Sequence, residues 1–215
     1  MARRSNKIRN ATDLYKMAEC YTRAAGFGWE ADWQRSRVFG DFSERDLLRE
    51  TAWVIMCSGF RESTVRCCFG YISLCFCDWE SAREIARHRR ACIDTAAARF
   101  QNYRKLNAIV NVADTICEAG FSRLQSRIHR EPIVELQQFP FVGPTTSWHL
   151  AKNLGLNVAK NDRHLAKFAE QYGFSSAHTL CQVIADMTGE PKSVVDIVLW
   201  RFATLFSGPQ SVRRS

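Results

Sequence analysis

The sequence contains no apolar run that approaches the roughly 20 residues that a membrane-spanning helix needs. It also lacks the apolar core of a signal peptide, because the basic residues 1–7 lead directly into a charged helical pattern. Pro/Ser-rich linkers, internal repeats, low-complexity tracts and long stretches of low hydrophobicity and high charge are absent as well. These absences predict a soluble, cytoplasmic protein with no membrane association and little extended disorder.

Cysteine pairs at metal-binding spacing are absent too. No Cys-x-x-Cys occurs, and the pair Cys75 and Cys77 has no second pair at zinc-finger distance, although His88 and Cys92 could join it. The nine cysteines are an odd number without a secretion signal, and most lie in apolar helical patterns. Buried free thiols behave as small hydrophobic side chains. We therefore expect no structural metal from these residues.

Alternation of polar and apolar residues at period two is rare, so we predict no sheet. Single glycines instead separate segments of about 10–18 residues with helical periodicity. Residues 43–46 (Ser-Glu-Arg-Asp) predict an N-cap box that opens a helix through Cys57, and Asp78 is predicted to start another helix. Residues 103–118 carry one apolar stripe, and residues 194–206 are apolar nearly all round, which predicts a central helix. These patterns are typical of an all-α protein.

We expect about ten helices in two lobes that are interleaved along the chain. The lobes form a single unit over residues 11–207, and a helical hairpin within it occupies approximately residues 131–155. Residues 1–10 are expected to be a loose basic tail and residues 208–215 a second tail, because chain ends are poorly ordered unless they are tied down.

Positive charge is in excess. The 30 Lys and Arg residues outnumber 22 Asp and Glu residues and leave a formal net charge of +8. Phosphate neutralisation drives much of nucleic-acid binding, so this excess fits a polyanionic partner. Residues 83–90, together with Arg99, Arg104 and Lys105, are candidates to line a DNA channel. A lone charge run of this kind is more typical of a solvated face.

The most informative segment spans residues 136–154. It predicts a helix, a tight turn at residues 140–143, and a second helix that begins near Pro144, where the missing N–H costs nothing. Gly143 in the turn allows a positive φ and leaves room for a phosphate to approach the backbone. The free N–H groups of the next residues then point outward from the positive end of a helix, which suits an anion. These residues are Thr145, Thr146 and Ser147.

This pattern describes a helix-hairpin-helix, a motif that binds the DNA backbone without reading its sequence. The alternative is an ordinary helical corner with a glycine cap. Residues 160–165 read Lys-Asn-Asp-Arg-His-Leu, which places Asp162 nineteen residues after Gly143. The hairpin followed at this distance by Asp-x-His-hydrophobic resembles the helix-hairpin-helix (HhH-GPD) DNA glycosylase superfamily, and within it the compact archaeal and bacterial 8-oxoguanine DNA glycosylases. Three further segments carry the resemblance: residues 50–58, 100–110 and 195–200.

The resemblance implies a two-lobed, all-α glycosylase fold and a base-excision repair enzyme. Such an enzyme would flip a damaged or mismatched base out of double-stranded DNA and act as a monomer, associated with the nucleoid in a bacterium or archaeon. An oxidised purine is the first expected lesion. Alkylated bases, uracil and mispaired bases stay open, because specificity depends on the shape of the base pocket.

The resemblance also implies that Asp162 is the catalytic carboxylate. Breaking the bond between base and deoxyribose builds oxocarbenium character on the sugar. A fixed carboxylate nearby stabilises that charge or orients the nucleophile. An Asp before Arg163 equally suits a helix N-cap, and the two roles are compatible. His164 is expected to hold the turn or a phosphate, or to be a partly buried structural imidazole.

Two positions depart from the family pattern. Bifunctional members place a Schiff-base lysine at the position of Thr145, and a hydroxyl cannot form an imine, so we predict monofunctional hydrolysis. Lys152 or Lys160 could replace that lysine only if it faced the cleft, which leaves a lyase at abasic sites as an alternative. Phe141 replaces the first glycine of the hairpin. Together these departures keep open a non-catalytic protein that binds double-stranded DNA.

By the same resemblance, the wedge that fills the gap left by a flipped base lies in the loop after Ser58. Phe60 and Arg61 are the candidates there, with plain loop residues as the alternative. Three tryptophans are available for a base pocket, although tryptophan at helical spacing is more often part of a core. These are Trp53, Trp148 and Trp200.

No cofactor is expected to be required. The four-cysteine C-terminal loop of endonuclease III-type relatives is missing, so no iron–sulfur cluster is implied. The resemblance does allow a monovalent cation on the hairpin carbonyls around Gln137, Phe139 and Val142.

Overall fold

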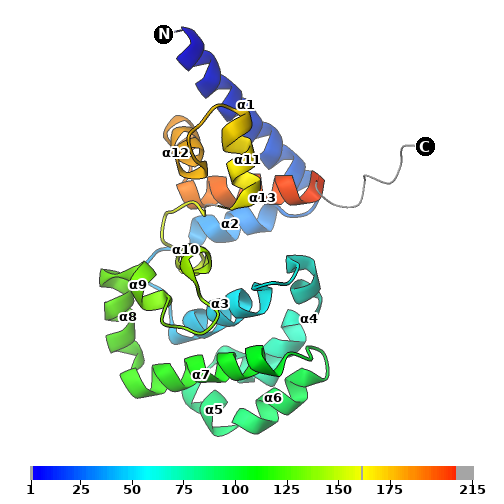
Figure 1. The fold of residues 1–215 in the computed structure, drawn as a ribbon, viewed down its shortest axis with the longest axis vertical. Helices are drawn as coiled ribbons and strands as arrows, with labels where there is room; N and C mark the ends of the chain where they lie inside the picture. The colour runs from blue at the N-terminus through cyan, green and yellow to red at the C-terminus, as the bar shows by residue number, and fades with distance from the viewer. Residues whose placement is uncertain (1, 161, 207–215) are drawn as a thin grey trace, which may run out of the picture. The chain divides into compact units, whose positions relative to one another are not determined.

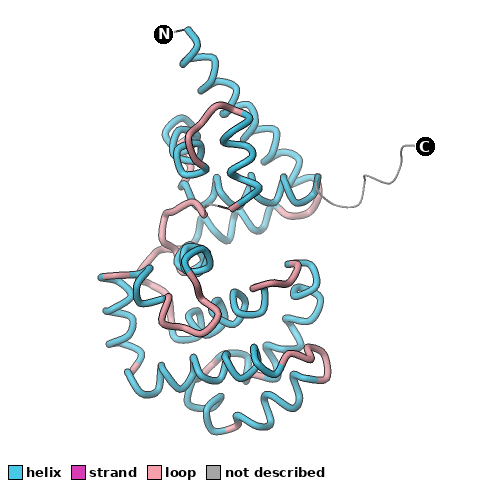
Figure 2. Tube along the Cα trace, in the orientation of Figure 1, coloured by secondary structure: helices cyan, strands magenta, loops and turns pink. Residues whose placement is uncertain are grey.

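A computed structural model describes residues 2–160 and 162–206. This part of the chain contains thirteen α-helices and one 3-10 helix and no strand (Figure 2). The all-α class predicted from the helical periodicity is therefore confirmed. The number of helices exceeds the expected ten because several are short, such as α9 (Pro132–Leu136). None of the helices in the described ranges combines the length and apolar character needed to cross a bilayer.

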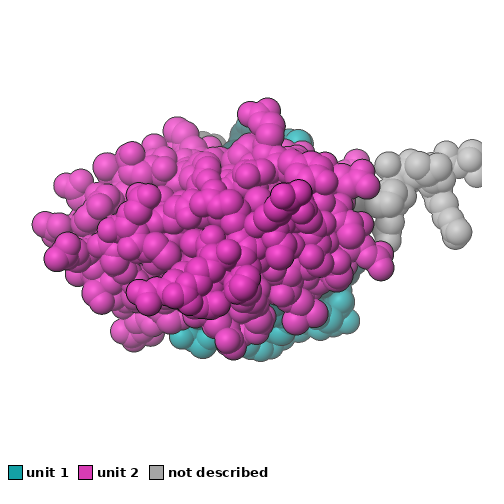
Figure 3. All heavy atoms as spheres, turned by 90° about the horizontal axis from the view of Figure 1, so that it is seen from below, with its two compact units in different colours: residues 1–37, 155–215 teal, residues 38–154 magenta. Residues whose placement is uncertain are grey.

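The helices form two compact units, which Figure 3 colours separately. Unit 1 takes residues 1–37 and 155–215, of which 2–37, 155–160 and 162–206 are described. Unit 2 is residues 38–154. The middle of the chain thus forms one unit, and the two flanking segments together form the other.

In unit 1, α13 (Lys192–Phe206) packs against the unit's four other helices (Figure 1). They are α1 (Ala2–Ala24), α2 (Gly28–Ser36), α11 (Arg163–Gln171) and α12 (Ala177–Thr188). Burial on several sides explains why α13 is apolar nearly all round, and Val194, Val195 and Leu199 are fully buried. The central helix predicted over residues 194–206 is confirmed.

The N-terminal segment differs from its prediction. We expected a loose tail over residues 1–10, whereas α1 begins at Ala2 and is continuous to Ala24. Its early residues include Ala, Arg and Lys, which have high helix propensity, and Ala11 and Leu14 anchor the same helix in the core of unit 1. The second predicted tail, residues 208–215, lies outside the described residues.

Unit 2 contains eight α-helices and the 3-10 helix. In chain order these are α3 (Glu44–Cys57), α4 (Glu62–Cys75), η1 (Cys77–Trp79), α5 (Ala82–Arg87), α6 (Arg89–Ala97), α7 (Tyr103–Ala119), α8 (Phe121–Arg130), α9 (Pro132–Leu136) and α10 (Pro144–Asn153). Helix α3 contacts α4, α7 and α10, so it links the N-terminal half of the unit to the hairpin (Figure 1).

The start of α3 confirms the predicted capping box. The Ser43 hydroxyl accepts a hydrogen bond from the Asp46 N–H (3.1 Å), and the Ser43 N–H donates to the Asp46 carboxylate (2.9 Å). The predicted start at Asp78 is wrong. Residues 77–79 have positive φ (54°, 47° and 65°), and the next α-helix begins only after Ser81. Fully buried Trp79 explains the difference, because its ring stacks on Phe76 within the core, which no local helix signal encodes.

Candidate DNA-binding and catalytic site

The segment predicted as a hairpin consists of α9, a turn over residues 137–143, and α10, which starts at Pro144 as expected. The positive φ expected at Gly143 is not found there, since Gly143 is extended (φ −94°) and serves as the N-cap. Phe141 takes the left-handed conformation instead (φ 62°). The tight turn therefore forms without a glycine at its left-handed position, and Gly143 is free to lead into α10.

The N-terminus of α10 leaves two backbone donors open. The first N–H groups of a helix have no helical carbonyl to bond, and at α10 these belong to Thr145 and Thr146, because Pro144 has none. Ser147 was predicted as a third donor, but its N–H donates to the Gly143 carbonyl (2.9 Å) and its side chain is fully buried. Ser147 therefore belongs to the interior of the hairpin.

The two threonine side chains have different surroundings. The Thr146 hydroxyl accepts from the Gly143 N–H (2.7 Å), so it closes the turn. Thr145 is exposed and directly follows Pro144, in the first turn of α10. An anion at this end of α10 would meet the Thr145 and Thr146 N–H groups and the positive end of the helix dipole.

The predicted wedge loop follows α3 in the same unit. Ser58 is the C-cap of α3, Gly59 has a positive φ (76°), and Arg61 is the exposed N-cap of α4. Phe60 at the tip is 42% exposed, which leaves its ring available to a partner. Its ring centroid is 5.4 Å from that of Phe100.

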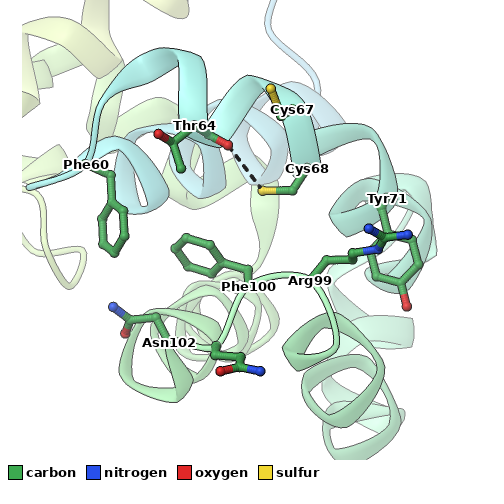
Figure 4. Close-up of a pocket in the computed structure, with 9 residues that line it drawn as sticks. Phe60, Thr64, Cys67, Cys68, Tyr71, Arg99, Phe100 and Asn102 are labelled. Atoms are coloured by element: carbon green, nitrogen blue, oxygen red, sulfur yellow. Dashed lines mark hydrogen bonds between the residues drawn. The ribbon is translucent and has the colours of Figure 1, made fainter.

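Phe60 and Phe100 lie at one end of a hollow in unit 2, where Figure 4 shows the two rings side by side. The hollow measures about 780 Å³ and combines aromatic, thiol, amide and guanidinium groups. It is lined by Phe60, Thr64, Cys67, Cys68, Tyr71, Arg99, Phe100, Gln101 and Asn102. None of the three tryptophans proposed for the base pocket lines it.

Those tryptophans have separate surroundings. Trp53 packs edge-on against Phe69 at 5.0 Å in unit 2, and Trp148 on α10 is 40% exposed. Trp200 belongs to unit 1, where it packs against the core and lies under the Lys160 ammonium at 5.6 Å. Trp53 and Trp200 thus behave mainly as packing residues.

Lys105 is another residue that sequence analysis misplaced. We grouped it with basic residues that could line a DNA channel or form a solvated face, but it is only 4% exposed, because the first turn of α7 faces the end of α3. Its ammonium donates to the carbonyls of Ile55, Met56 and Ser58. Arg99 and Arg104 are exposed, as a solvated face requires.

Asp162 in unit 1 caps α11. Its Oδ1 accepts from the N–H groups of His164 (2.9 Å) and Leu165 (3.0 Å), which confirms the N-cap interpretation. Its Oδ2 lies 3.4 Å from the Lys160 ammonium, and its side chain is 12% exposed. The carboxylate is therefore held rigidly, with one oxygen committed to the helix and the other facing a cation.

The neighbours of Asp162 are fixed as well. The Lys160 N–H donates to the Asp196 carboxylate of α13 (2.7 Å), which ties the chain before Asp162 to the central helix. Burial lowers the pKa of His164 below its ordinary value, although the Asp162 carboxylate acts in the opposite direction. A neutral imidazole next to the cap follows at neutral pH. This favours the structural interpretation of His164 over that of a cationic phosphate ligand.

The remaining expectations concern metal binding and the two lysines, Lys152 and Lys160, that could replace the missing hairpin lysine. The nine cysteines are free, and within the described ranges no three His, Cys, Asp or Glu side chains are grouped to hold a metal. Lys152 is 3% exposed, and Lys160 faces Asp162. In the hairpin turn, the Phe139 carbonyl accepts from the Val142 N–H (3.1 Å). The cation expected on these carbonyls stays a prediction.

Comparison with known proteins adds one likeness. No family model matches the sequence, and no curated protein matches it. Among solved structures, the chain is similar to the crystal structure of the 8-oxoguanine DNA glycosylase of Thermotoga maritima, with a TM-score of 0.54 and 15% sequence identity. The match covers 88% of this chain and 95% of that chain. At this identity the likeness shows that the chain shares the helical fold of that glycosylase.

Proposed function

We propose that this protein is a DNA glycosylase that removes a damaged or mismatched base from double-stranded DNA by hydrolysis. The observation that carries the proposal is the shared fold, which spans nearly the whole of both chains. The sequence supports it independently through the hairpin followed by the Asp-x-His segment at residues 162–164. The solved relative suggests 8-oxoguanine as the first base to test.

In this proposal α10 holds the DNA backbone. A phosphate at its N-terminus accepts hydrogen bonds from the Thr145 and Thr146 N–H groups, and the exposed Thr145 hydroxyl adds a third donor. Such contacts position the duplex without reading its sequence. The net charge of +8 supports the same kind of partner.

Asp162 performs the chemistry. Cleavage of the bond between C1′ and the base nitrogen leaves positive charge on the sugar, and a carboxylate stabilises that charge. Water then adds its oxygen to C1′, and the proton that water loses passes to the base nitrogen, which took the electron pair of the broken bond, so the base leaves neutral. Two backbone N–H groups and Lys160 hold the Asp162 carboxylate in one orientation, which suits a group that must act without reorganising.

The products follow from the residues that could form a Schiff base. Thr145 has a hydroxyl at the family's lysine position and cannot form an imine. Lys152 is buried, and the Lys160 ammonium is paired with the Asp162 carboxylate, so neither side chain is presented as a nucleophile. The proposed enzyme therefore releases the base and leaves an intact strand with an abasic site. Phe60 and Arg61 are proposed to fill the gap that the flipped nucleotide leaves.

The test is a panel of duplexes, each with one lesion, incubated with the protein and analysed with and without alkali. We expect strand breaks only after alkali. Breaks without alkali would contradict the assignment of Thr145, and borohydride trapping would then identify the lysine. Binding without base release across the panel would favour a non-catalytic DNA-binding protein, in which Asp162 acts only as a helix cap.

Asp162→Asn tests the catalytic residue. Asparagine is as good an N-cap as aspartate, so the variant keeps α11 while it removes the negative charge. We expect base release to fall by about 100-fold or more, the size of effect seen when one stabilising electrostatic group is lost, and duplex binding to change little. Asp186→Asn, an exposed carboxylate on α12, is the matched control and should retain full activity.

A further inference from the structure

Lys105 on α7 contacts two other segments of unit 2 through one ammonium group: the end of α3 with the loop that follows it, and the hairpin turn. Its Nζ donates to the carbonyls of Ile55, Met56 (3.0 Å) and Ser58, where α3 ends. The same atom lies 5.0 Å from the centroid of the Phe60 ring and 5.3 Å from that of the Phe141 ring. Phe60 belongs to the proposed wedge loop, and Phe141 belongs to the hairpin turn.

The carbonyls explain why a buried ammonium is tolerated here. The last carbonyls of a helix have no helical donors, and the negative end of the helix dipole favours a cation. Lys105 supplies a donor to three carbonyls at this end of α3. Two aromatic faces also lie beside the ammonium and attract a cation through their quadrupole. Removal of the ammonium would leave buried carbonyls without a donor and both rings without their shared partner.

Both rings are partly exposed, and the Phe60 ring also packs against that of Phe100, with 5.4 Å between the centroids. Phe60 is 42% exposed and follows Gly59, whose positive φ suits a residue without a side chain. Phe141 is 37% exposed and sits in a left-handed conformation that side chains rarely adopt. A conformation of that kind persists only when its surroundings hold it in place. The contact with Lys105 is one such constraint.

We propose that Lys105 is a positioning residue whose ammonium holds the wedge loop at residues 58–61 and the hairpin turn at residues 140–143 in one fixed relation. The inference rests on the proposed function for the roles of these two segments in DNA binding. Preorganisation of this kind lowers the ordering cost when both segments must engage DNA together. Lys105 itself touches no reacting atom.

The first test needs no DNA. Hydrogen exchange is followed at the Phe60, Val142 and Gly143 amides, each of which donates within its own turn. Lys105→Met keeps most of the apolar stem and removes the charge. We expect exchange at all three amides to accelerate by about tenfold, the order set by loss of one charged hydrogen-bond donor. Acceleration at Phe60 with unchanged exchange at Val142 and Gly143 would overturn the proposal, because Lys105 would then only cap α3.

A matched variant separates positioning from simple loss of stability. Ile109→Ala removes a fully buried side chain one turn further along the same helix and leaves the Lys105 ammonium in place. The two variants are compared in urea concentrations that give them equal free energies of unfolding. Under these conditions Ile109→Ala should leave the Phe60, Val142 and Gly143 amides protected. Equal acceleration in both variants would contradict the proposal. Lys105→Arg keeps the cation and should restore part of the protection if Lys105→Met proves too unstable to measure.

The second test uses binding. We expect Lys105→Met to reduce the preference for a duplex with a stable abasic-site analogue over an undamaged duplex by about tenfold, while Ile109→Ala retains that preference. In the wild-type background, the effects of Phe60→Leu and Phe141→Leu on this preference should not be additive. In the Lys105→Met background the two effects should become additive. Additive effects in wild type would refute the shared role. Failure of the glycosylase assay leaves the exchange experiment valid, so the two proposals fail separately.

Discussion

Phe141 departs from the motif predicted over residues 136–154, yet a turn still forms between α9 and α10. The left-handed region costs a residue with a side chain roughly 1–3 kcal/mol, and Phe141 occupies it at φ 62°. The turn is then closed by the hydrogen bond from the Gly143 N–H to the Thr146 hydroxyl. The Phe141 ring gains the Lys105 contact, which a glycine could not make.

A pH dependence follows from Lys105. Burial lowers the pKa of Lys105 to about 8, with Cys57 acting in the opposite direction, whereas an unfolded lysine titrates at about 10.4. The cost of removing the ammonium from water therefore exceeds what the carbonyls and the two rings return, although these partners fix its position. Between these values the unfolded chain binds more protons than the folded one. The free energy of unfolding therefore rises with pH in this window, by at most about 1.4 kcal/mol per pH unit for one proton.

The measurement compares urea unfolding of wild type and Lys105→Met between pH 7 and pH 10. The stability of wild type relative to the variant should be constant below about pH 7.5 and should increase from pH 8 to pH 10. Groups common to both proteins cancel in this difference. A relative stability that falls with pH would mean that the ammonium form is favoured in the folded state.

At the scale of single elements, local signals placed the helices well when the signal was a cap or an apolar stripe. The box at Ser43 and Asp46, the stripe of α7 and the apolar run of α13 each matched the structure. The error at Asp78 arose where a buried tryptophan, Trp79, controls the backbone. A cap is encoded within four residues, whereas burial depends on distant partners.

The cap at Ser43 has a measurable contribution. Ser43→Ala removes the acceptor for the Asp46 N–H and should lower the free energy of unfolding by about 1 kcal/mol. Chemical denaturation monitored by circular dichroism measures the change. Ser63→Ala, at an exposed position inside α4, should change stability by less than about 0.5 kcal/mol. Equal effects of the two substitutions would show that the box contributes nothing specific.

At the scale of the molecule, charge is the property that the proposed function uses. The excess of positive residues belongs to the whole chain, since no single run accounts for the +8. Charge of this size draws a polyanion to the surface but does not select a base. In the proposed function, selection comes from the wedge and the base pocket, so the affinity for DNA and the preference for a lesion should respond differently to salt.

Salt titration tests this division. Binding to an undamaged duplex should weaken by at least about tenfold between 50 and 200 mM salt, which corresponds to about two or more neutralised phosphates. The preference for an abasic-site analogue over the undamaged duplex should change much less. Fluorescence anisotropy measures both. Affinity that is independent of salt would argue against backbone binding by the hairpin.

The sequence by itself determined what is local or compositional: the all-α class, the caps, the start of α10 at Pro144, and Asp162 as the cap of α11. Only the tertiary structure decided that Ser147 and Lys105 are buried and that Phe141 carries the positive φ. The physical reason is that helix signals act over one turn of chain. Burial and side-chain partners depend instead on which helices pack together, and Lys105 meets carbonyls about 50 residues away along the chain.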